Sequence, residues 1–130
     1  MDSGAIRRRL AMGAAVLAGS LGLALAVPGT ASAAVDRSCA GREVRALPFS
    51  TGTVHVFKRN GYVCAVTIAR NPGATRVMSV SVQARGNRPV VDKGLYKHRA
   101  GPVTVHAGQR CVWVKGTVGR DSVSSGWILC

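Results

Sequence analysis

Acid–base catalysis in this 130-residue chain would depend on its three histidines and on a small number of carboxylates. From residue 34 onward these are His55, His98, His106, Asp36, Glu43, Asp92 and Asp121. A small secreted ribonuclease would use Glu43 or one histidine as general base, a second histidine as general acid, and a lysine or arginine on the phosphate. His55 and His106 alternate with valines, however, which favours histidines on an exposed face or at a sheet edge. We therefore assign no catalytic residue.

The sequence contains no motif for nucleophilic or metal-assisted catalysis. The chain has no Gly-x-Ser-x-Gly, the turn that exposes the serine of many hydrolases. All four cysteines are expected to be oxidised, which removes a thiolate nucleophile. No Cys-x-x-Cys occurs and the histidines are scattered, so we predict neither a zinc site nor any other cofactor.

Positive charge is the strongest chemical signal in the composition. The chain carries 18 Lys and Arg against 5 Asp and Glu, a formal net charge of +13. The segment 85–99 is the most loop-like part of the chain, and its only carboxylate is Asp92. Its basic residues are Arg85, Arg88, Lys93, Lys97 and Arg99.

These five residues are candidates for an exposed anion-binding surface. Outside a cell, teichoic acids, acidic polysaccharides, phospholipid head groups and released DNA would all be attracted by charge alone. The alternative interpretation is a solvated face that keeps the protein soluble. No motif for sequence-specific nucleic-acid recognition is present, so no such partner is predicted.

Trp113 and Trp127 allow two interpretations. A tryptophan can be a platform for sugar stacking, or it can bury its large apolar area in a core. In Cys111-Val112-Trp113-Val114, the tryptophan shares a strand face with Cys111. Core packing of Trp113 against a disulfide is therefore the favoured interpretation.

The N-terminus has the three parts of a secretory signal peptide. A basic cluster, Arg7-Arg8-Arg9, precedes an uncharged run over residues 10–27, and Ala31-Ser32-Ala33 then supplies the small residues of a cleavage site. An uncleaved anchor is the weaker alternative, because the run is short and rich in Ala and Gly. We predict a signal peptide over residues 1–33 and a secreted domain over 34–130, with a net charge of +11 and no transmembrane segment.

The cysteines of this predicted domain indicate a disulfide framework. An even number of cysteines in an exported chain of under 100 residues is typical of disulfide-stabilised domains. The residues are Cys39, Cys64, Cys111 and Cys130, which allow three pairings. The pairs Cys39–Cys64 and Cys111–Cys130 are favoured, because each would close a short loop at one end of the chain.

Valine content decides the fold class. From residue 34 onward there are 17 Val against 3 Leu and 2 Ile, and β-branched side chains suit a pleated sheet. Two alternating runs flank Asn60-Gly61, which is the strongest short-range signal for a β-hairpin. We predict an all-β fold, a small antiparallel sandwich or barrel of about seven short strands. The expected strands lie near residues 43–47, 53–59, 62–69, 78–84, 102–106, 110–115 and 122–130.

Four short motifs occur along the chain in an order and at spacings that are typical of one protein family. They are Gly61-Tyr62-Val63-Cys64-Ala65-Val66-Thr67, Gly94-Leu95-Tyr96, Ala100-Gly101-Pro102-Val103 and Arg110-Cys111-Val112-Trp113. Over residues 53–119 the chain thereby resembles the spore-associated protein A family of small secreted actinomycete proteins. The resemblance implies an extracellular protein found with spores or aerial structures, without established enzymatic activity, in which Cys64 and Cys111 form disulfides. Lys97-His98-Arg99 departs from the family pattern, which has more aromatic residues there, so a shared fold is implied more strongly than a shared ligand.

The sequence therefore leads to one main functional hypothesis and two alternatives. The main one is a secreted, basic protein of the cell or spore surface that acts by binding rather than catalysis. The first alternative is an inhibitor of an extracellular hydrolase, with Arg88 before Pro89 as its reactive residue. The second is a small secreted nuclease. Anionic envelope polymers are the predicted partners, and the extracellular space or cell surface is the predicted location.

Overall fold

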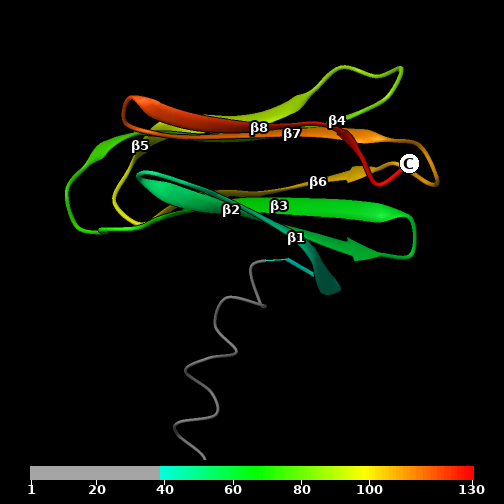
Figure 1. The fold of residues 1–130 in the computed structure, drawn as a ribbon, viewed down its shortest axis with the longest axis horizontal. Helices are drawn as coiled ribbons and strands as arrows, with labels where there is room; N and C mark the ends of the chain where they lie inside the picture. The colour runs from blue at the N-terminus through cyan, green and yellow to red at the C-terminus, as the bar shows by residue number, and fades with distance from the viewer. Residues whose placement is uncertain (1–38) are drawn as a thin grey trace, which may run out of the picture. The chain divides into compact units, whose positions relative to one another are not determined.

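The computed structural model describes residues 39–130, and this part of the chain is all-β, as predicted. Eight strands form two four-stranded antiparallel sheets that face each other as a sandwich (Figure 1). The strands are β1 (Arg42–Phe49), β2 (Gly52–Arg59), β3 (Tyr62–Ala69), β4 (Arg76–Ala84), β5 (Val90–Tyr96), β6 (Arg99–His106), β7 (Val112–Val118) and β8 (Asp121–Ile128). Within residues 39–130 no helix is long and apolar enough to span a membrane. The predicted signal peptide, residues 1–33, lies outside the described residues.

The two sheets are built from hairpins that are joined by crossings between the layers. Sheet A has the strand order β1-β2-β3-β6, and sheet B has the order β5-β4-β7-β8. Figure 1 shows β7 and β8 of sheet B above β2 and β3 of sheet A. In the strand order of sheet B, β4 and β7 are the two central strands and β5 is an edge strand.

The strand β5 lies in the segment for which the sequence predicts a loop, so that prediction is wrong. β5 pairs with β4 over seven positions, from Val82↔Val90 to Arg76↔Tyr96. Asp92 and Gly94 occupy the positions opposite the buried residues of β4, where a strand pattern calls for apolar side chains. The alternation is therefore concealed in the sequence, and the sandwich has eight strands rather than about seven.

The hairpin predicted at Asn60-Gly61 is present. Both residues have positive φ values, 50° and 81°, as a two-residue turn of type I′ requires. Arg59 pairs with Tyr62 across this turn, which fixes the register of β2 against β3. Outer-face residues of β2 therefore lie beside outer-face residues of β3.

Valines fill the space between the sheets. The core side chains come from alternate positions on the inner strands, and most of them are completely buried. The largest are Met78, Val54, Val56, Val63, Val80, Val82, Val112, Val114 and Val118. A smaller buried cluster lies on the other side of sheet A, where Phe57 and Val66 pack with the disulfide of Cys39 and Cys64.

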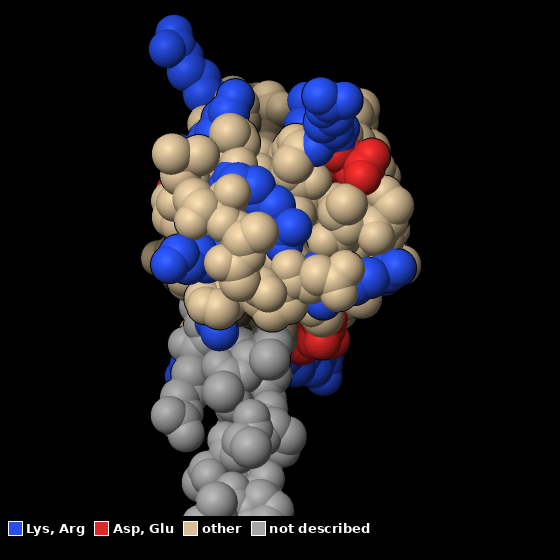
Figure 2. Space-filling view, turned by 90° about the vertical axis from the view of Figure 1, so that its left-hand side faces the viewer, with Lys and Arg blue, Asp and Glu red and all other residues tan. Residues whose placement is uncertain are grey.

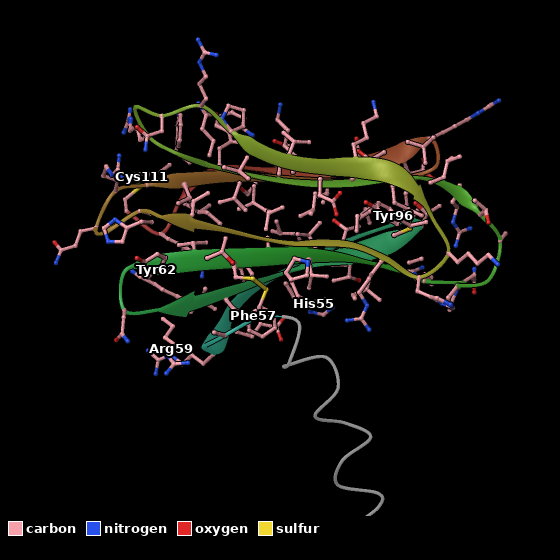
Figure 3. All side chains as sticks on the ribbon, turned by 180° about the vertical axis from the view of Figure 1, so that it is seen from behind. His55, Phe57, Arg59, Tyr62, Tyr96 and Cys111 are labelled. Carbon is pink, nitrogen blue, oxygen red and sulfur yellow. A yellow bond between two sulfur atoms is a disulfide. The ribbon has the colours of Figure 1, made fainter. Side chains whose placement is uncertain are left out.

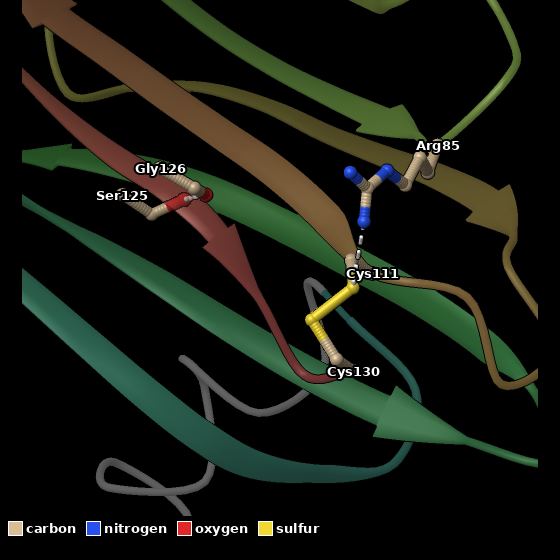
Figure 4. The surroundings of a disulfide bond; sticks show 5 residues. All are labelled: Arg85, Cys111, Ser125, Gly126 and Cys130. Carbon is tan, nitrogen blue, oxygen red and sulfur yellow. Dashed lines mark hydrogen bonds between the residues drawn. A yellow bond between two sulfur atoms is a disulfide. The ribbon is translucent and has the colours of Figure 1, made fainter.

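Both favoured disulfide pairings are confirmed. Cys39 is bonded to Cys64, with their Cα atoms 5.6 Å apart, and Cys111 is bonded to Cys130, with Cα atoms 4.1 Å apart. The second bond ties the C-terminal residue to the segment just before β7 (Figure 4). Two disulfides indicate folding in an oxidising environment.

Candidate anion-binding face

Strand periodicity places polar residues on the outer face of sheet B. On β4, the buried residues Met78, Val80 and Val82 alternate with the outward side chains of Ser79, Ser81 and Gln83. The same alternation on the neighbouring strands turns lysine, hydroxyl and tryptophan side chains outward. The outer face of sheet B is defined here by Ser79, Ser81, Gln83, Lys93, Trp113, Lys115, Thr117, Ser122, Ser124 and Trp127, together with the apolar Val77, Val91 and Leu95.

Two lysines flank the serines in the middle of this face. Lys93 of β5 is opposite Ser79, and Lys115 of β7 is opposite Ser81, so β4 lies between the two lysines. They are separated by two strand spacings across the sheet and two residues along it, which puts their Cα atoms about 12 Å apart. Thr117 pairs with Ser79 on the other side, which extends the row of hydroxyls.

The face is hollowed along its middle. A groove of about 270 Å³ follows β4 and is lined by side chains from β4, β5 and β7, together with Pro89. Both lysines contribute to its wall, and Trp113 lines it as well. A chain-like ligand in this groove would meet two ammonium groups and several hydroxyls at once.

No carboxylate opposes these lysines among the described residues of the outer face. Asp92 turns inward from β5, where its two oxygens accept hydrogen bonds from the Tyr96 hydroxyl at 2.6 Å and the Gly101 amide at 2.7 Å. Glu43 lies on sheet A, and Asp121 pairs with the buried Val118. The positive charge of Lys93 and Lys115 is therefore not neutralised on this face.

The bond between Tyr96 and Asp92 also changes the acidity of the phenol. The hydrogen bond to Asp92, aided by partial burial and by the negative charge of the carboxylate, raises the pKa of Tyr96 above its ordinary value of about 10. The hydroxyl proton stays on Tyr96 because it forms the hydrogen bond between the Tyr96 oxygen and Asp92 Oδ1. This contact orients Asp92 away from the outer face.

A pair of tryptophans closes one end of the face. Trp113 and Trp127 are cross-strand partners whose rings meet edge to face, with centroids 5.3 Å apart. The indole N–H of Trp113 donates to Ser124 Oγ at 2.6 Å. The guanidinium of Arg85 lies over the Trp127 ring, and one of its nitrogens lies 3.9 Å from Cys111 Sγ (Figure 4).

The prediction that Trp113 packs in the core is wrong. Trp113 is only half-buried, because Val112 and Val114 on either side of it take the inward positions. Trp127 is 38% exposed. Both tryptophans thus belong to the surface that carries the lysines.

The five predicted anion-binding residues do not form one loop surface. Arg85 and Arg88 belong to the connection before β5, Lys93 lies within β5, and Lys97 follows it. Arg99 begins β6 in sheet A. From Arg88 to Lys97 is nine residues of largely extended chain, about 30 Å. Figure 2 shows the end of the domain at the β5–β6 turn, where Lys and Arg occupy several places separated by other residues.

Lys115 was missed by sequence reasoning. It lies 22 residues beyond Lys93 in the chain, and only the pairing of β4 with both β5 and β7 brings them to one face. The alternation of Trp113, Lys115 and Thr117 with buried residues was a usable signal for an outward face. No pattern in the sequence indicated that β4 would lie between β5 and β7.

His55 and His106 lie on the outer face of sheet A, as predicted from their alternation with valines, and His98 lies in the turn between β5 and β6. His55 Nδ1 lies 2.6 Å from Glu43 Oε2, and the ring of His106 meets that of Tyr62 edge to face at 4.8 Å. Figure 3 shows His55 and Tyr62 at different places along this sheet. His55 pairs with Val66 of β3 and His106 pairs with Tyr62 of the same strand, which puts the two histidines about 16 Å apart. This separation is too large for them to act together on one phosphodiester. Residues 39–130 contain no cluster of three or more His, Cys, Asp or Glu that could hold a metal ion.

No family model, curated protein or solved structure matches this chain. The resemblance to spore-associated proteins therefore stays a prediction. Any function assigned to the outer face of sheet B rests on its own chemistry: two unopposed lysines, a row of hydroxyls and a tryptophan pair.

Proposed function

We propose that the protein is exported and binds anionic polymers of the cell or spore surface through the outer face of sheet B, without catalysing a reaction. The observation that carries this proposal is the placement of Lys93 and Lys115 on either side of the serines of β4, on a face without a carboxylate among its described residues. The two disulfides support an oxidising, extracellular location, and the predicted signal peptide supports export.

The chemistry of the groove suits a polymer with repeated phosphate or carboxylate groups. Each lysine ammonium pairs with one anionic group as a mobile point charge. The hydroxyls of Ser79, Ser81 and Thr117 exchange hydrogen bonds with polar groups between the charges. Such a surface reads charge density and not monomer sequence.

The tryptophan pair favours polymers that contain sugar rings. Trp113 lines the groove beside Gln83, its cross-strand partner, and the apolar surface of an indole packs well against the C–H face of a sugar. A glycosylated teichoic acid or an acidic polysaccharide would contact both the lysines and Trp113. We expect such polymers to bind more tightly than inorganic polyphosphate of equal charge.

The experiment is a binding titration with purified teichoic acid and with heparin, comparing two double variants. Lys93→Gln/Lys115→Gln removes the two central charges of the face. Lys97→Gln/Arg120→Gln removes the same net charge from exposed turns and is the matched control. The first variant should lose affinity on the order of tenfold, and the control should change little, since two exposed ion pairs contribute about 0.2–1 kcal/mol each and about 1.4 kcal/mol corresponds to a factor of ten.

Salt provides a second readout of the same experiment. With two ion pairs formed, by Lys93 and Lys115, a tenfold rise in salt should weaken binding on the order of 30-fold through counterion release. Equal loss in both double variants would mean that net charge matters and the outer face of sheet B does not. Affinity that is insensitive to salt would also contradict the proposal.

Inhibition of an extracellular hydrolase is the second candidate, and one feature favours it. The connection between β4 and β5 is braced by a bond from the Asn87 amide to the Ala84 carbonyl and by Gln83 Nε2, which donates to the Asn87 carbonyl, both at 2.9 Å. Arg88 follows this braced turn and is exposed. If the second candidate is correct, the protein will inhibit a trypsin-like protease and Arg88→Ala will abolish the inhibition.

A further inference from the structure

The edge strand β5 presents exposed apolar side chains. Leu95 is 69% exposed and Val91 56%, and Val77, which pairs with Leu95 from β4, is 40% exposed. These three residues, named here the β5 patch, lie on one face of sheet B and are half of the six large hydrophobic residues that are exposed in the described part of the chain. Clustered exposed hydrophobics on a small domain commonly mark a contact with another molecule.

Basic residues surround the β5 patch. Lys93 lies between Val91 and Leu95 on the same face of the strand, since residues two apart in a strand point the same way. Arg88 precedes β5 by two residues, and Lys97 follows its last residue. The only carboxylate of the strand, Asp92, accepts two internal hydrogen bonds. The exposed edge is thus apolar and cationic, without an exposed anion.

We propose that the β5 patch docks onto the surface of an anionic lipid bilayer. Apolar side chains of peripheral proteins enter the boundary between head groups and acyl chains, while nearby Lys and Arg pair with anionic lipids. Lysine side chains bury their methylene stems and keep the ammonium at the head groups, so Lys93 fits between two inserted hydrophobics. Because β5 is at the edge of sheet B, it can meet a flat surface along its whole length of about 24 Å.

A second copy of this chain fits the β5 patch poorly. Two β5 strands related by a two-fold axis and paired antiparallel over their whole length would be centred on Lys93, the middle residue of Val90–Tyr96. Lys93 would then face Lys93 of the other copy, and like charges directly opposite each other in a sheet are destabilising. The flanking basic residues of the two copies would add to the repulsion. An anionic surface removes this penalty.

The experiment is co-sedimentation with vesicles of phosphatidylglycerol and phosphatidylcholine, against vesicles of phosphatidylcholine alone. Val77→Thr/Leu95→Thr removes apolar surface from the β5 patch with side chains that suit a strand, and neither residue lines the groove. Tyr62→Thr removes an apolar side chain that is 51% exposed on the opposite sheet and is the control. Melting temperatures of all three proteins check that each is folded.

The parent and Tyr62→Thr should sediment with the anionic vesicles, and Val77→Thr/Leu95→Thr should bind them on the order of tenfold or more weakly. Binding of soluble teichoic acid should be unchanged in the double variant, which separates this inference from the proposed function. Equal vesicle binding by the parent and the double variant would overturn the proposal. So would a parent that forms dimers in solution and becomes monomeric with Val77→Thr/Leu95→Thr, because the patch would then serve a second copy.

Discussion

The guanidinium carbon of Arg85 lies 5.3 Å from the centroid of the Trp127 ring, which joins the end of β4 to β8 across the intervening strand β7. This contact forms one end of the outer face of sheet B. It also lies beside the disulfide of Cys111 and Cys130, because a nitrogen of Arg85 approaches Cys111 Sγ. The tryptophan end of the face is thus held by a cation, a ring pair and a covalent bond.

Replacing Arg85 by Gln should lower the free energy of unfolding by about 0.5–1 kcal/mol, the usual range of an exposed cation–π contact. Urea unfolding of the variant measures the change. Arg88→Gln is the control, since it removes the same charge three residues away. If Arg88→Gln destabilises the protein as much, the effect comes from net charge and not from the contact with Trp127.

Replacing both Cys39 and Cys64 by Ser should destabilise the domain by about 2–5 kcal/mol. The bond closes a loop with a sequence separation of 25 and anchors the cluster around Phe57. A loss of this size is a large share of the stability of a small domain. Thermal unfolding measures it, and a variant that keeps the parent melting temperature would show that this bond is unimportant for stability.

Replacing Gly116 by Ala should destabilise the domain by about 1–3 kcal/mol through overpacking. An added Cβ at Gly116 would overlap the Val54 side chain and come within 2.6 Å of Thr67 Oγ1, both in the other sheet. Gly94→Ala is the matched control, because the atoms nearest to its Cβ would be those of the Tyr96 side chain, at 3.3–3.4 Å. Equal melting temperatures for Gly116→Ala and the parent would show that the sheets can separate without cost.

The raised pKa of Tyr96 predicts a loss of stability in alkali. A group whose pKa is higher in the folded state than in the unfolded state contributes stability below its unfolded pKa, and this contribution disappears as the pH rises toward the folded value. Tyr96→Phe should therefore be less stable than the parent at pH 8, and the difference should shrink as the pH rises above about 10. Unfolding free energies of both proteins at a series of pH values measure this. A constant difference would mean that Tyr96 does not titrate differently in the two states.

The all-β class, the hairpin at Asn60-Gly61 and the disulfide pairs were accessible from the sequence because each depends on local pattern or on short loops. The strand β5 was not accessible, since Asp92 takes an inward position that a strand pattern normally gives to an apolar residue. Its carboxylate is tolerated there because Tyr96 and Gly101 donate hydrogen bonds to it. Those partners depend on tertiary contacts that no sequence pattern reveals.

The candidate site shows the same division. Lys93 was identified from local charge, but Lys115 became its neighbour through the strand order of sheet B, which is a non-local property. The core position predicted for Trp113 rests on the strand face that it shares with Cys111. The prediction fails because this shared face does not tell which side of β7 is buried. Local composition therefore predicts the kind of chemistry at this surface, while topology decides which residues share it.

Tryptophan fluorescence tests the central claim most directly, because Trp113 and Trp127 are the only two tryptophans of the chain and both lie on the outer face of sheet B. Teichoic acid should produce a saturable change in emission that high salt reverses and that Lys93→Gln/Lys115→Gln largely removes. Polymer binding that is evident from sedimentation but leaves the emission unchanged would contradict the claim that this face is the binding surface.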